Sequence, residues 1–280
     1  MQSVLKAIAE LYSAVRRNQP FDLAAQIAFW SLLALFPFAI FVLTILGYLR
    51  IAGLESELFL FAGQVLPSDA VRLIQSTLGE VTHRQHGLLL WAALFAALWS
   101  ASSGVRGLLV ALNRAHDVEE TRSFIHIKLL AIAITLATAL LLAVAMAGFL
   151  IGPELGQTLW RWLGLGKFSH HLWHVIRWPI VLWALTALLA AVYYFLPNQK
   201  QRFRLVTLGS TVAVALWLGV SWLFRWYVSH VGSFTRTYGT LGAAVMLLVW
   251  LYLSGVAGIL GGEINALGHR RSGQRRKRSD

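Results

Sequence analysis

The chain has 280 residues, of which 58% are hydrophobic and only 13% are charged. A soluble domain has nearer a quarter of its residues charged, so the composition excludes a water-soluble globular protein and predicts a polytopic membrane protein. The twelve tryptophans agree with this, because Trp concentrates where lipid meets water. The absence of cysteine excludes disulfides and thiolate metal sites.

Residues 1–22 are predicted to form a cytoplasmic amphipathic helix that lies on the membrane surface. The segment lacks the continuous apolar stretch and the small-residue cleavage site of a signal peptide. Its apolar residues recur instead at helical spacing, which gives one face to lipid and one to water. These residues are Val4, Ile8, Leu11 and Val15.

Six later segments are apolar and long enough to cross ~30 Å of hydrocarbon as helices, which predicts an all-α fold. They form a transmembrane domain over residues 23–267, followed by a basic cytoplasmic tail, residues 268–280. In the first loop, Val71, Ile74, Leu78 and Val81 repeat at helical spacing, which predicts a short helix on the outer face. The six spans are residues 23–49, 88–112, 128–151, 175–196, 205–228 and 240–267.

The basic residues predict the orientation of these spans. Outside the spans or near their ends, the N-terminus, the second and fourth loops and the tail carry fifteen Lys and Arg, against eight on the opposite side. Positive charge favours the cytoplasmic side, so both termini are predicted to be cytoplasmic. The net charge of +12 is therefore mostly a topology signal rather than a nucleic-acid footprint. The tail either contacts anionic headgroups or is simply solvated.

Small residues recur every fourth position in the second, third and sixth spans. Such residues let helix backbones approach closely in lipid, so these three spans are predicted to form the centre of the bundle. In the alanine-rich third span, the alternative is that the spacing arises by chance. The first span holds Pro37 midway, which predicts a kink that is either a hinge or fixed geometry. The packing candidates are Ser100, Gly104, Gly107, Ser254, Gly258 and Gly262.

Two charges interrupt the apolar spans. Arg106 lies in the second span and Glu263 near the end of the sixth, and small residues flank both. An ionisable residue within a span usually faces the bundle interior and finds a partner, so we expect the two to pair. Alternatively, Arg106 extends its guanidinium to the headgroups. Further polar candidates at a similar depth are Asp22, Gln26, Asn113 and Asn265.

The outward-facing ends offer weaker candidates. His170, His171 and His174 have a spacing seen at zinc sites, but no acidic third ligand is nearby and the HExxH motif is absent. Flanking tryptophans indicate an interfacial belt instead, so no metal or cofactor is predicted. Arg225, Arg236 and Tyr238 either hold an anionic headgroup or are solvated.

Four segments resemble the YihY/virulence factor BrkB family: AFWSLLALFPF (28–38), LWSASSGVRGLLVALNRAHDVEETR (98–122), YYFLPNQKQRFR (193–204) and YGTLGAAVMLLVWLYLSGVAGILGGEINA (238–266). The resemblance implies a bacterial inner-membrane protein with about six spans. Some members were once labelled a ribonuclease, and others are associated with serum resistance and envelope lipid export. The matching positions are Pro37, Trp99, Ser100, Asn113, Arg122, Pro197, Tyr238, Gly239, Gly242, Gly261 and Glu263.

These features predict a non-enzymatic envelope protein that transports or hands over an anionic lipid-like molecule, such as a phospholipid or lipopolysaccharide precursor. The alternative is a scaffold that holds envelope protein partners and moves no substrate. RNA hydrolysis is the least favoured function, because we find no His/Asp cluster that supplies acid–base groups. The expected partners are membrane lipids and envelope proteins, with no nucleic acid.

Overall fold

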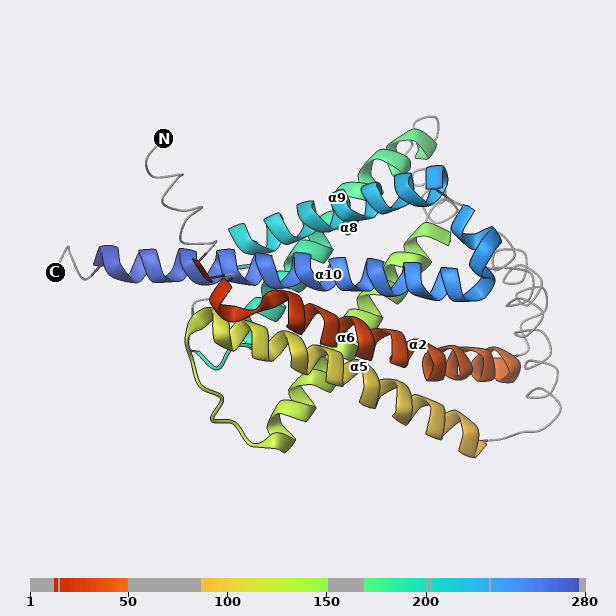
Figure 1. Cartoon of the computed structure of the whole chain (residues 1–280), viewed down its shortest axis with the longest axis horizontal. Helices are drawn as coiled ribbons and strands as arrows, with labels where there is room; N and C mark the ends of the chain where they lie inside the picture. Colours follow the sequence, from red (N-terminus) through yellow and green to blue (C-terminus); the bar gives the residue numbers. More distant parts are fainter. Residues whose placement is uncertain are drawn as a thin grey trace.

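The computed structural model describes residues 13–14, 16–49, 87–150, 169–199, 201, 203–231 and 233–276. This part of the chain forms six long helices (Figure 1). Each contains a segment that is long and apolar enough to cross a membrane, which confirms the predicted all-α membrane architecture. The helices are α2 (Pro20–Leu49), α5 (Gly87–His116), α6 (Phe124–Leu150), α8 (Ser169–Phe195), α9 (Leu208–Val231) and α10 (Ser233–Arg276).

The six helices alternate in direction along the bundle. Helices α2, α6 and α9 begin at the end where α5, α8 and α10 finish, as Figure 1 shows. We call this the terminal end, because α2 follows the N-terminal segment there and α10 reaches Arg276. Helix α10 is 44 residues long and continues past the predicted boundary at residue 267.

The packing centre consists of α2, α5 and α10. Helix α5 packs most extensively on α2, and α10 packs on α9, α2 and α5. Helix α6 contacts mainly α5, and only Ile127 and Ala131 are buried among its side chains from 124 to 144. The predicted central position of this span is therefore wrong. A helix that is apolar all round is as well solvated by lipid as by protein, so its alanines do not by themselves select a protein neighbour.

Glycines allow the closest approaches between the central helices. Gly104 and Gly107 of α5 lie against α2, where a Cβ on Gly107 would come within 3.0 Å of Ile27. Gly209 of α9 and Gly261 of α10 face each other so closely that a Cβ on Gly261 would lie 2.6 Å from the carbonyl oxygen of Gly209.

The other packing candidates make different contacts. Ser100 is buried and Gly262 lies against Leu112. A Cβ on Gly258 would meet open space, and Ser254 donates its hydroxyl to Trp250 O within its own helix.

Several predictions fall outside the described residues. They include most of the N-terminal amphipathic helix, the outer helix at 71–81 and the side chains of the three histidines, of Arg236 and of Tyr238. Residues 16–18 are helical, and Gln19, with φ of 51°, separates them from α2. Helix α2 runs through Pro37 without a break in its assignment, so the proposed hinge there stays a prediction.

Candidate functional site

Glu263 is buried in α10, thirteen residues before the helix ends at Arg276, with only 1% of its surface exposed. Asn18, in the segment before α2, donates a hydrogen bond of 2.6 Å from Nδ2 to Glu263 Oε1. Asn18 is itself 5% exposed. A buried carboxylate without a donor is costly, so this contact fixes the N-terminal segment against α10.

Charged side chains surround this buried pair. Asp117, just after α5, forms two ion pairs. Its Oδ1 lies 3.0 Å from Arg17 Nη2, and its Oδ2 lies 2.5 Å from Arg270 Nη2. Arg114 also donates a hydrogen bond of 3.4 Å to the carbonyl oxygen of Asn18. The N-terminal segment is thus attached to both α5 and α10. An open depression of about 430 Å³ lies over this junction.

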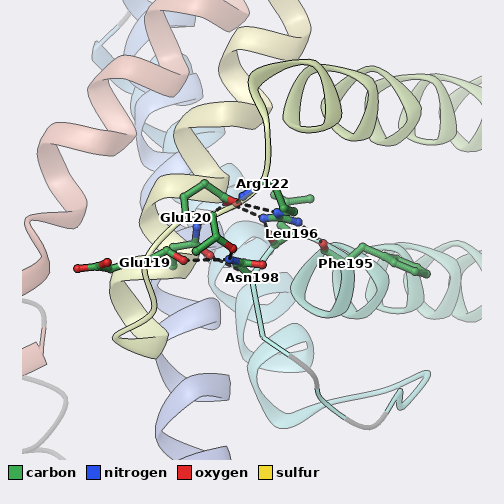
Figure 2. A network of polar contacts seen from close by, with 8 residues as sticks. Glu119, Glu120, Arg122, Phe195, Leu196 and Asn198 are labelled. Atoms are coloured by element: carbon green, nitrogen blue, oxygen red, sulfur yellow. Dashed lines mark hydrogen bonds and ion pairs between the residues drawn. The ribbon is translucent and has the colours of Figure 1, made fainter.

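A second network joins the α5–α6 loop to the end of α8 (Figure 2). Arg122 donates to both carboxylate oxygens of Glu120, at 2.8 Å and 2.7 Å, and to the carbonyl oxygen of Leu196 at 2.7 Å. The hydrogen bonds from Arg122 lower the pKa of Glu120 to about 2. Arg122 therefore also satisfies a carbonyl group at the end of α8, where helical partners are absent.

Asn113 extends this network into the bundle. Its side chain is 5% exposed, donates to Glu120 Oε2 at 2.9 Å and accepts from Asn198 N at 2.8 Å. Asn198 in turn donates to the carbonyl oxygen of Glu119 at 2.9 Å. Figure 2 shows the side chain of Glu119 pointing away from these contacts. Asn113 thus holds two loops together and is one of the predicted polar candidates.

The predicted pair of Arg106 and Glu263 is not formed, because Glu263 binds Asn18 while Arg106 is exposed on the outside of the bundle. The helical rotation explains the error. Leu112 is the α5 residue that meets Gly262 of α10. At about 100° per residue, Arg106 points roughly 120° away from that contact and lies about 9 Å from it along the axis.

Arg106 instead faces the start of α6. Its guanidinium carbon lies 5.6 Å from the centre of the Phe124 ring. One turn further along α6, Lys128 Nζ lies 3.8 Å from the Trp99 ring of α5. It donates to Trp99 O at 3.1 Å and to Ser103 Oγ at 3.4 Å.

We call these five residues the α5–α6 seam. On α5, Trp99, Ser103 and Arg106 share a face through their spacing of four and three residues. On α6, Phe124 and Lys128 are four residues apart. Lys128 reaches Ser103, three residues before Arg106, so the two cations lie on neighbouring turns of the seam, where like charges repel each other. The rings of Trp99 and Phe124 are 46% and 56% exposed, so the seam opens to the surroundings of the bundle.

The remaining candidates lie apart from this seam. Asp22 is exposed in the first turn of α2, and Gln26 is exposed one turn later, near Gly107. Asn265 packs beside Gly209, and Arg225 is exposed on α9. They do not form one site together.

Asn18 and Lys128 were not predicted as site residues. Lys128 could have been found from the sequence, because it is a charged residue at the start of the apolar third span. The role of Asn18 could not be read from the sequence, because its partner Glu263 is 245 positions away.

Comparison with known proteins identifies relatives along nearly the whole chain. Residues 11–280 match the family described as virulence factor BrkB. The chain is 37% identical over 264 residues to the putative ribonuclease-like protein YfkH of Bacillus subtilis, covering 94% of this chain and 95% of that protein. No solved structure matches the chain.

Two further relatives are named UPF0761 membrane protein. The one from Alkalilimnicola ehrlichii is 28% identical over 253 residues, which cover 89% of this chain and 55% of the relative. The one from Glaesserella parasuis is 37% identical over 101 residues, or 36% of this chain and 34% of the relative. The chain thus spans about half or less of the length of these two relatives. The match over residues 11–280 decides the assignment: the chain belongs to the virulence factor BrkB family of membrane proteins.

Proposed function

We propose that this membrane protein resides in the bacterial inner membrane, with both termini cytoplasmic, and transports or hands over an anionic lipid. The observation that carries the proposal is the exposed position of Arg106 on the outside of α5, within the span Leu90–His116. No described acidic side chain forms an ion pair with it.

A cation at this depth needs an anionic or polar partner. Charged groups within a span are costly unless they are paired or reach the interface. Arg106 presents five N–H donors on a planar group that matches phosphate geometry, and the bilayer supplies phosphate groups on its lipids. A lipid phosphate is therefore the partner whose chemistry fits this position.

The sequence also permits a scaffold that binds partners without moving lipid. A scaffold does not need to bind and release lipid, whereas a transporter does both in each cycle. The word ribonuclease belongs to the name of the Bacillus subtilis relative. Our proposal assigns the basic residues of this chain to topology and lipid contact instead.

The test measures lipid movement between the leaflets of vesicles that contain the purified protein. Phosphatidylglycerol with a fluorescent acyl chain is placed in both leaflets, and a membrane-impermeant quencher is then added. The protein is expected to raise the rate of leaflet exchange above that of protein-free vesicles, and Arg106→Gln to lower it several-fold. Arg204→Gln, at an exposed loop position, is the matched control and should retain the wild-type rate.

Exchange no faster than in protein-free vesicles would contradict transport and favour the scaffold. An equal rate of leaflet exchange for wild type and Arg106→Gln would show that Arg106 does not contact the lipid as it moves. Transfer to acceptor vesicles in the same preparation distinguishes hand-over from exchange, because only hand-over moves the fluorescent lipid between vesicles.

A further inference from the structure

The α5–α6 seam contains two cations, although a single cation is enough to contact one phosphate group. Arg106 and Lys128 come from different helices and lie on neighbouring turns of the seam, because Lys128 donates to Ser103, which precedes Arg106 by three residues on the same face of α5. Neither forms an ion pair with an acidic side chain in the described part of the chain. Like charges that are held together without a protein counter-ion create a local positive potential, which an anion relieves.

The seam leaves hydrogen-bond donors open to such an anion. Lys128 has three N–H groups, and two of them are directed to Trp99 O and Ser103 Oγ. The ammonium group also lies over the Trp99 ring, 3.8 Å from its centre, so Lys128 offers its charge to an anion and would exchange one of these weaker contacts for it. Arg106 is exposed, with its guanidinium carbon 5.6 Å from the centre of the Phe124 ring, and its group carries five N–H donors.

The aromatic side chains place the cations relative to the bilayer. Trp99 and Phe124 flank them and are about half exposed, and Trp is a residue that concentrates at the lipid–water interface. Arg106 lies ten residues before the end of α5, about 15 Å along the helix, and Lys128 about 6 Å from the start of α6. The seam therefore lies in the half of the bundle towards the terminal end.

We propose that Arg106 and Lys128 together bind the phosphomonoester headgroup of a lipid from the leaflet at the terminal end. This inference rests on the proposed function and names its substrate class. A phosphomonoester carries about −1.5 to −2 charges near neutral pH, so it neutralises both cations. A phosphodiester carries one charge and leaves a cation unpaired. The three oxygens of a monoester also accept from both side chains at once.

The experiment compares two lipids with identical acyl chains. Native mass spectrometry of the purified full chain is used to measure the binding of phosphatidate, a phosphomonoester, and phosphatidylglycerol, a phosphodiester. Phosphatidate is expected to bind roughly tenfold more tightly, which corresponds to about 1.4 kcal/mol from one further charge-assisted contact. Arg106→Gln and Lys128→Gln should each reduce this preference to less than twofold. Arg204→Gln should retain it.

Charge-preserving variants protect the test against a folding defect. Arg106→Lys and Lys128→Arg keep both cations and should retain most of the preference, whereas a merely structural role would make them as defective as the glutamine variants. Equal binding of the two lipids by the wild type would overturn the proposal. So would a preference that survives both glutamine substitutions.

A soluble ligand is distinguished by competition. Inorganic phosphate and glycerol 3-phosphate share the headgroup chemistry but lack acyl chains. Displacement of bound phosphatidate by either compound at millimolar concentration would show that the seam binds phosphate from solution, and would overturn a lipid site. Retention of phosphatidate under these conditions supports it.

The leaflet-exchange assay separates this inference from the proposed function. Equal binding of the two lipids together with protein-dependent exchange would overturn the phosphomonoester site and leave transport in place. A phosphatidate preference without exchange or transfer would overturn transport, while the binding site would stand.

Discussion

Asn18 and Glu263 lie 245 positions apart in sequence and are joined by a hydrogen bond of 2.6 Å inside the protein. This contact attaches the segment before the first span to the last helix of the bundle. Arg17 and Arg270, each next to Asp117, reinforce the junction from both sides. The first and last spans of the chain are thereby held together at the terminal end.

Replacing Asn18 by alanine is expected to lower the free energy of unfolding by about 1–3 kcal/mol, because the buried carboxylate of Glu263 loses its donor. Asn18→Asp should cost more, since it brings a second acidic group to the same place. Thermal unfolding in detergent, followed by size-exclusion chromatography, measures both. Arg16→Ala, at an exposed neighbouring position, serves as the control. A wild-type melting temperature for Asn18→Ala would show that the contact contributes little.

Two glycines of α10 provide a matched test of helix packing. A Cβ on Gly261 would lie 2.5 Å from Ala213 Cβ and 2.6 Å from Gly209 O, whereas a Cβ on Gly258 would meet nothing within 4 Å. Gly261→Ala should therefore lower the melting temperature. Gly258→Ala should keep or raise it, because alanine favours a helix over glycine by about 1 kcal/mol. Similar changes for both variants would refute the close packing of α9 and α10.

The ion pair in the α5–α6 loop predicts a pH dependence of stability. The hydrogen bonds of Arg122 lower the pKa of Glu120 from 4.5 to about 2 in the folded protein. The stabilisation is therefore fully present above pH ~4.5 and is lost as the pH falls from there towards 2. The difference in melting temperature between wild type and Glu120→Gln should shrink over this range.

Glu119→Gln is the control for this titration, because the Glu119 side chain points away from the network and only its carbonyl oxygen takes part (Figure 2). Its difference from the wild type should show no comparable change with pH. A constant difference for Glu120→Gln between pH 5 and pH 2.5 would contradict the assigned role of Arg122.

Arg122→Lys should weaken the connection between the two loops at the terminal end. The guanidinium reaches Glu120 Oε1, Glu120 Oε2 and Leu196 O together, and a single ammonium group does not reproduce that geometry. We expect a loss of about 1–3 kcal/mol in stability and faster amide hydrogen exchange at 117–123 and 196–199. Arg204→Lys is the control. Unchanged exchange in both loops would show that lysine suffices.

The positions of the six spans were predictable from the sequence, because a continuous apolar segment of sufficient length is stable in the bilayer whatever its neighbours are. The predicted fourth and fifth spans, at 175–196 and 205–228, correspond to α8 and α9, and the short connection between them forces an antiparallel hairpin. The ends were less well predicted, as α10 shows by continuing to Arg276. A helix can continue past its apolar segment, and the hydropathy of the sequence does not show where the helix ends.

The partners of the polar residues depended on the tertiary structure. The sequence identified Glu263 and Arg106 as charges within apolar segments but assigned them to each other. Their separation follows from the rotation of α5, which turns Leu112 towards α10 and Arg106 towards α6. That rotation is set by the close packing of Gly104 and Gly107 on α2.

The sequence by itself therefore determined that the chain is a six-span membrane protein with two intramembrane charges. Only the tertiary structure decided that Glu263 is buried and bound to Asn18, while Arg106 lies on the outside of the bundle against Phe124 of α6. The physical reason is that burial in lipid depends on composition along the chain. Pairing depends instead on which helix faces meet, and contacts between residues far apart in sequence fix those faces.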